Sequence, residues 1–158
     1  MKIMYVEDDE SQRRLMQLRF PEWVVEVSPD PEGARVLMDA NGHEAIVLDL
    51  HLSCGMTWQE AVRYLQELFV APIIGYSGFV DDAIRESLLA MGVYDVLTKG
   101  EADDKWNLKR AVEGAAAKFK LKRYELERTR GLTDLRDQIR TLNRELREAG
   151  GIHGDRSG

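Results

Sequence analysis

The chain has 158 residues, of which 44% are hydrophobic and 32% are charged, so it can form a folded core and is not wholly disordered. The single cysteine, Cys54, excludes an intramolecular disulfide framework and favours a reducing, cytoplasmic location, and the chain shows neither a membrane-spanning apolar run nor a signal-peptide pattern. The net charge of −6 is uneven, because residues 1–100 hold 17 acidic and 8 basic side chains whereas residues 101–158 hold 11 and 14.

Short apolar runs alternate with amphipathic segments through residues 1–100. The apolar runs predict five strands, at Ile3–Val6, Trp23–Val27, Ala45–Leu48, Pro72–Tyr76 and Tyr94–Leu97. Helices are predicted between them, over Ser11–Phe20, from Asp30 onwards, over Trp58–Phe69, and from Asp81 or Asp82 to Gly92. This alternation predicts βαβ units and an α/β fold, a doubly wound parallel sheet with helices on both faces.

A long helix is predicted after the fifth strand, because residues 103–149 contain no proline and are rich in Leu, Arg, Glu and Lys. Five residues in it are spaced three and four apart, the a/d pattern of a coiled coil: Leu132, Leu135, Ile139, Leu142 and Leu146. We therefore expect a helical extension over 119–149 and a disordered tail over 150–158. Mixed charges on the outer faces favour a homodimer or a partner protein over nucleic acid.

Polar side chains gather where the predicted strands end. Acids follow the first and third strands, a serine follows the fourth and a lysine the fifth: Glu7, Asp8, Asp9, Asp49, Ser77 and Lys99. Because the carboxyl ends of parallel strands meet at one edge of the sheet, these groups are expected to converge. Clustered carboxylates select hard cations such as Mg²⁺ or Mn²⁺. A carboxylate beside such a cation and a lysine is suited to attack a phosphoryl group.

Four segments that carry these residues resemble the receiver domains of two-component response regulators. They are Val6–Glu10, Val47–Leu50, Tyr76–Gly78 and Gly92–Lys99, in the family's order. The resemblance covers residues 1–118 as a receiver domain. It implies the flavodoxin-like fold, with the βα unit repeated five times, here followed by a long C-terminal helix.

The resemblance implies that Asp49 accepts a phosphoryl group and that Ser77 and Lys99 bind the phosphoryl oxygens. The donor would be a phosphohistidine on a sensor histidine kinase or a phosphotransfer protein. On this interpretation the protein is a signalling protein and not an enzyme, with at most slow autodephosphorylation. Its output would be a change in the C-terminal helix, by dimerisation or by docking of a partner.

Mg²⁺ is the cofactor that the resemblance implies. Asp8 and Asp49 would ligate it directly, Glu7 through a water molecule, and His51 through its backbone carbonyl. For the side chain of His51 two alternatives stand: it lines the mouth of the pocket and tunes the phosphoryl lifetime, or it is a solvated loop residue.

The chain departs from the family pattern at three positions. Val96 stands where receivers usually have the Tyr or Phe of a rotameric switch, and Tyr94, two positions earlier, is expected to point to the same face. Gly100 and Ser53 each replace a proline of the family. These departures motivate an alternative, a phosphorylation-independent pseudo-receiver that acts as a dimerisation or interaction module.

Two further alternatives remain. A metal-dependent phosphatase working through an aspartyl intermediate usually has a second acid two residues after its nucleophile, where this chain has His51. Residues Gly131–Arg136 resemble the entry to a diguanylate cyclase domain, for which no residues remain in these 158. We therefore expect no output domain within this sequence, and truncation before one is the alternative.

Overall fold

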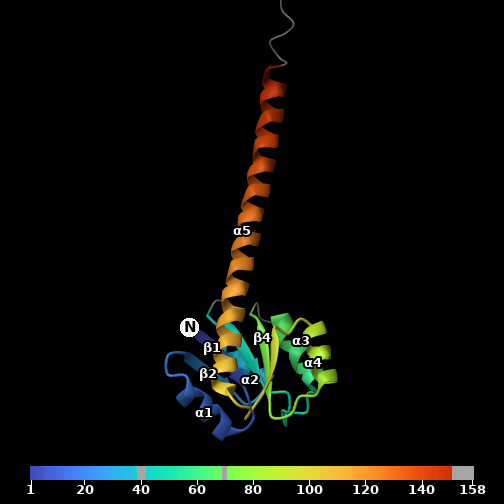
Figure 1. Ribbon diagram of the computed structural model, residues 1–158. Helices are drawn as coiled ribbons and strands as arrows, with labels where there is room; N and C mark the ends of the chain where they lie inside the picture. The colour runs from blue at the N-terminus through green and yellow to red at the C-terminus, as the bar shows by residue number, and fades with distance from the viewer. Residues whose placement is uncertain (39–41, 69–70, 151–158) are drawn as a thin grey trace, which may run out of the picture. The chain divides into compact units, whose positions relative to one another are not determined.

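The computed structural model describes residues 1–38, 42–68 and 71–150 (Figure 1). The chain divides into two compact units, Met1–Phe119 and Lys120–Gly158. The first unit holds a sheet with its covering helices, and the second holds the later part of one long helix. The tail predicted over 150–158 lies outside the described residues except for Gly150, the last residue of that helix.

Five parallel strands form one sheet in the described part of the chain. In chain order they are β1 (Lys2–Val6), β2 (Val24–Ser28), β3 (Ala45–Leu48), β4 (Ile73–Ser77) and β5 (Asp95–Thr98). Their order across the sheet is β2-β1-β3-β4-β5. The central strands β3 and β4 are buried at every residue, as expected of apolar runs covered on both faces. The predicted doubly wound, flavodoxin-like α/β fold is confirmed.

The helices begin close to the positions that the sequence predicts. They are α1 (Glu10–Arg19), α2 (Pro31–Leu37), α3 (Trp58–Leu68), α4 (Asp82–Ala90) and α5 (Asp104–Gly150). Aspartates cap the starts of α2 and α4: Asp30 accepts a hydrogen bond from Gly33 N at 2.6 Å, and Asp81 accepts one from Ile84 N at 2.7 Å. The predicted end of α3, Phe69, lies outside the described residues.

Two layers of helices cover the sheet (Figure 1). In one layer, α1 and the first part of α5 pack on the sheet, and their core includes Phe20 and Leu108. In the other layer, α2, α3 and α4 pack around a core that includes Ala34, Val62 and Leu88. The polar residues lie at the carboxyl ends of the strands, just beyond the apolar residues that the two layers bury.

The expected placement of Tyr94 on the same face as Val96 is wrong. Val96 is fully buried in the layer of α2, α3 and α4, whereas the Tyr94 hydroxyl lies near Gly114 of α5, in the other layer. The alternation of faces holds only within a strand, and Tyr94 precedes β5, which begins at Asp95. The turn at Gly92, with φ 89, redirects the chain before the strand starts.

We expect Leu108→Ala to cost about 3 kcal/mol of unfolding free energy, because it opens a cavity under the first part of α5. Leu108 is fully buried, whereas Leu126 on the same helix is 59% exposed. Urea unfolding of Leu108→Ala and of the control Leu126→Ala checks this. An equal loss of stability in both variants would contradict the packing of α5 on the sheet.

In the second unit, residues 120–150 continue α5, and residues 120–145 are all exposed. The exposed side chains include the predicted a/d residues Leu132, Leu135, Ile139 and Leu142, each more than half exposed. Leu146 lies among side chains that the structure does not describe. No helix in the described residues has the length and apolar character needed to cross a membrane.

Candidate functional site

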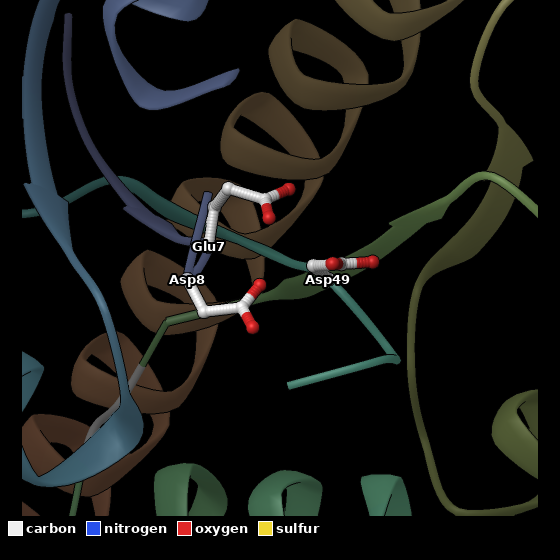
Figure 2. A group of neighbouring side chains, drawn as sticks. All are labelled: Glu7, Asp8 and Asp49. Carbon is white, nitrogen blue, oxygen red and sulfur yellow. The ribbon is translucent and has the colours of Figure 1, made fainter. Parts of the chain in front are cut away.

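The acidic residues meet where the strand order of the sheet reverses. The chain passes from β1 to β2 on one side and then to β3 on the other, so the ends of β1 and β3 flank a crevice of the kind that holds ligands in such folds. Glu7 and Asp8 follow β1, and Asp49 follows β3 (Figure 2). One carboxylate oxygen from each of the three residues lies within 4.8 Å of the other two.

Glu7 is the most deeply buried acid of the three, at 2% exposure. Its carboxylate accepts a hydrogen bond from the Tyr5 hydroxyl at 2.9 Å and from Asp9 N at 3.1 Å, and it pairs with the Lys99 ammonium. Burial raises the pKa of Glu7, and the hydrogen bonds from Lys99 and Asp9 oppose that rise. Burial and the neighbouring Glu7 carboxylate also raise the pKa of Tyr5, which keeps its hydroxyl a donor.

Lys99 reaches the same crevice from the end of β5. Its Nζ lies 3.6 Å from Asp49 Oδ1 while it is bonded to Glu7. The ring centroids of Tyr5 and Tyr76 lie 6.0 and 5.5 Å from the same nitrogen. The ammonium therefore sits among carboxylates and aromatic rings, nearer to Glu7 than to Asp49.

Asp8 is held by the loop after β3. Its Oδ2 accepts a hydrogen bond from Ser53 N at 3.1 Å, and hydrogen bonding by Ser53 lowers the pKa of Asp8. A proline at position 53, as in the family pattern, has no N–H and could not donate this bond. The departure at Ser53 thus gives Asp8 a partner that the usual residue would not supply.

Asp49 presents a buried oxygen without a hydrogen bond. Its Oδ1 is buried and finds no donor in the described structure, and the residue is only 6% exposed. A buried carboxylate oxygen normally has a partner, so this one is poised for a cation or for chemistry. Together with the carboxylates of Glu7 and Asp8, the Asp49 carboxylate forms the hard, anionic donor set that a divalent cation such as Mg²⁺ prefers. The residues present therefore fit Mg²⁺.

Ser77 and His51 meet at the side of this crevice. Ser77, the last residue of β4, is fully buried, and its Oγ lies 2.8 Å from Nδ1 of His51. The side chain of His51 is thus a neighbour of the site hydroxyl, although the residue is exposed overall. The structure brings together Glu7, Asp8, Asp49 and Lys99, and it places Ser77 beside His51.

Two residues that the sequence analysis did not identify form hydrogen bonds with the acids of the site. Tyr5 donates to Glu7, and Arg13 of α1 donates through its NH1 to the backbone oxygens of Glu7 and Asp8, at 2.7 and 2.8 Å. One signal was present: a tyrosine inside an apolar, buried run of a strand requires a partner for its hydroxyl, and an acid follows two residues later. Arg13 had no such signal, because arginines on a helix surface are common.

The sequence matches no protein-family model and no curated protein. Many solved structures are nevertheless similar. A response regulator receiver domain protein from Clostridium thermocellum is 17% identical with a TM-score of 0.67, and the match covers 76% of this chain and 97% of that one. An adenylate cyclase structure from Rhodopirellula baltica is 16% identical with a TM-score of 0.70, covering 82% and 96%.

A third similar structure carries a trimeric coiled-coil segment of yeast Spc42, fused to another structure. It is 19% identical with a TM-score of 0.69, and the match covers 92% of this chain and 95% of that one. Other similar structures include a receiver domain from Leptospira biflexa and a two-component response regulator from Clostridium difficile. The chain has the fold of a response regulator receiver domain, followed by a long C-terminal helix.

Proposed function

We propose that this protein is a response regulator receiver that accepts a phosphoryl group on Asp49 and signals through its C-terminal helix. The observation that carries the proposal is the buried Asp49 Oδ1, which lacks a hydrogen bond and lies 3.6 Å from the Lys99 ammonium and beside the carboxylates of Glu7 and Asp8. The donor is a phosphohistidine on a sensor histidine kinase or a phosphotransfer protein.

In the proposed transfer, a carboxylate oxygen of Asp49 attacks the phosphorus of the donor. The new P–O bond forms as the P–N bond to the donor imidazole breaks, and the electron pair of that bond returns to the imidazole nitrogen. The Lys99 ammonium and the Ser77 hydroxyl bind the equatorial oxygens, and Lys99 leaves Glu7 to do so. Asp8, Asp49, Glu7 and the His51 carbonyl would hold Mg²⁺, which when bound neutralises charge that develops on those oxygens.

The phosphorylated site differs from the resting one mainly in charge. At neutral pH the phosphoryl group carries roughly −1.5 to −2 charges in place of the single negative charge of the carboxylate, and this draws Lys99 and Ser77 towards Asp49. Lys99 is followed within a few residues by α5. The proposed output is a change in the pairing or docking of α5, carried by its apolar stripe of Leu132, Leu135, Ile139 and Leu142, which is exposed.

We expect the apolar stripe to form a homodimer and Ile139→Glu to abolish it, because a charge at an a position removes the apolar contact and repels its copy. The control is Arg144→Glu, an exposed residue outside the a/d stripe. Light scattering of the full chain, with and without acetyl phosphate and Mg²⁺, measures the mass. A mass that is the same for Ile139→Glu and the wild type in both conditions would contradict this output.

A pseudo-receiver is the second candidate. The observation that favours it is Val96, an aliphatic side chain that is fully buried in the layer of α2, α3 and α4 and supplies no aromatic ring for a switch. In that case the same helix pairs without any phosphoryl transfer.

Intact mass spectrometry separates these two candidates. The wild-type protein incubated with acetyl phosphate and Mg²⁺ is expected to gain the mass of one phosphoryl group, which base removes and which a chelator in the reaction prevents. A protein that dimerises but gains no mass is a pseudo-receiver, and the phosphoacceptor proposal then fails.

A further inference from the structure

Tyr76 touches both the site and the start of α5. This residue of β4 is 3% exposed, and the centroid of its ring lies 5.5 Å from the Lys99 ammonium. Its hydroxyl donates a hydrogen bond to Oδ2 of Asp104 at 2.7 Å, and Asp104 is the first residue of α5. One buried side chain therefore contacts the lysine of the site at its ring and the first turn of α5 at its hydroxyl.

The Asp104 carboxylate collects further donors. Gly100 N donates to the same Oδ2 at 3.1 Å, and Arg19, at the end of α1, approaches it at 3.4 Å. Arg19 also donates to the Tyr76 hydroxyl at 3.0 Å. Hydrogen bonds to charged groups are stronger than those between neutral groups, so this cluster holds the N-terminus of α5 against β4 and α1.

The loop between β5 and α5 contains two residues with unusual backbone angles. Gly100 has φ 79, and Asp103 has φ 60, the left-handed region that residues other than glycine seldom adopt. Such a conformation persists when surrounding contacts hold it, and Asp104, next to Asp103, makes those contacts. A shift of Lys99 thus acts on a short segment whose geometry depends on the Asp104 carboxylate.

We propose that Tyr76 is the positioning residue through which the placement of Lys99 sets the stability of the first turn of α5. When the ammonium leaves the ring for a phosphoryl group, the ring loses its cation and the Tyr76–Asp104 hydrogen bond weakens. The first turn of α5 then opens more readily. This coupling through Tyr76 lies in the layer of α1 and α5, on the opposite side of the sheet from Val96. The part of the proposal that concerns the phosphorylated protein rests on the proposed function.

Amide hydrogen exchange over residues 100–112 of the full chain tests this proposal, with the amides of β3 as the reference for global opening. Two perturbations take the ammonium away from the ring: labelling with acetyl phosphate and Mg²⁺ draws it to the phosphoryl group, and Lys99→Met without labelling removes it. Each is expected to speed exchange in the segment by about tenfold relative to β3, the order expected when a hydrogen bond to a charged group is lost.

Tyr76→Phe keeps the ring and removes the hydroxyl, so in that background both perturbations are expected to change exchange less than twofold. Asp104→Asn, which weakens the same bond from its other end, should reduce the response in the same way. The matched control is Tyr94→Phe, because the Tyr94 hydroxyl also faces α5, at Gly114. Its response is expected to equal that of the wild type.

A response of full size in Tyr76→Phe overturns the proposal, as does no response of the wild type to Lys99→Met. Failure of the proposed function gives a different result. In that case the wild type does not label, while the Lys99→Met arm still decides whether Tyr76 couples the site to α5.

Discussion

Asp49→Asn is expected to abolish phosphoryl labelling and at the same time to raise the stability of the Mg²⁺-free protein. Labelling is lost because an amide oxygen is a poor nucleophile. Stability rises, by about 1 kcal/mol, because the substitution removes a buried anion whose Oδ1 has no hydrogen bond and which faces the carboxylates of Glu7 and Asp8. Lys99 offsets only part of that repulsion, since its ammonium is hydrogen-bonded to Glu7 and also forms an ion pair with Asp49 at 3.6 Å.

Urea unfolding with and without Mg²⁺ measures the free energy of unfolding, and intact mass spectrometry measures phosphoryl labelling. At a hundredfold excess over its Kd, Mg²⁺ should add about 2.7 kcal/mol to the wild type and less to Asp49→Asn. The control is Asp82→Asn, an exposed acid outside the cluster, which should label and bind Mg²⁺ as the wild type does. Equal labelling of Asp49→Asn and the wild type would show that another residue is the acceptor.

Lys99→Met is expected to lower the free energy of unfolding by about 3 kcal/mol in the absence of Mg²⁺, because it leaves the Glu7 carboxylate buried without its cation. Methionine preserves the length of the apolar stem, so little packing is lost. The same variant should label more slowly than the wild type, since the ammonium no longer stabilises the transferring group.

The double variant Glu7→Gln/Lys99→Met distinguishes the lost charge pair from lost packing. If the pair is the cause, the double variant regains most of the stability, because it no longer holds an unpaired buried anion. Urea unfolding of the two single variants and the double variant completes the cycle. A loss that persists in the double variant would attribute the effect to packing around Tyr5 and Tyr76.

Much of the fold follows from local features of the sequence. The apolar runs at Ala45–Leu48 and around Ile74 are buried at every residue, and a short continuous apolar run bounded by turn residues is typical of a strand covered on both faces. Asp30 and Asp81 cap helices where the sequence places them. The gathering of acids at one edge also follows, because parallel strands bring their carboxyl ends together whatever the details of the loops.

The contacts inside the site could not be predicted in the same way. That Lys99 bonds Glu7 more closely than Asp49, and that Tyr76 reaches Asp104, depends on the lateral order of strands far apart in the sequence. The alternation of side chains along a strand predicts which face of the sheet a side chain lies on, but it does not predict which residue that side chain contacts. Tyr94 is an example: it lies one residue before β5, so the turn and not the strand sets the direction of its side chain.

Reductive trapping of the labelled protein tests the central proposal most directly. Borohydride reduces an acyl phosphate to an alcohol, so a phosphorylated aspartate becomes homoserine, which peptide mass spectrometry can locate. The wild type treated with acetyl phosphate and Mg²⁺ is expected to carry homoserine at position 49 and at no other aspartate. Reduction at Asp8 or Glu7 instead, or no reduced residue in a protein shown to be folded, would contradict the assignment of Asp49 as the phosphoacceptor.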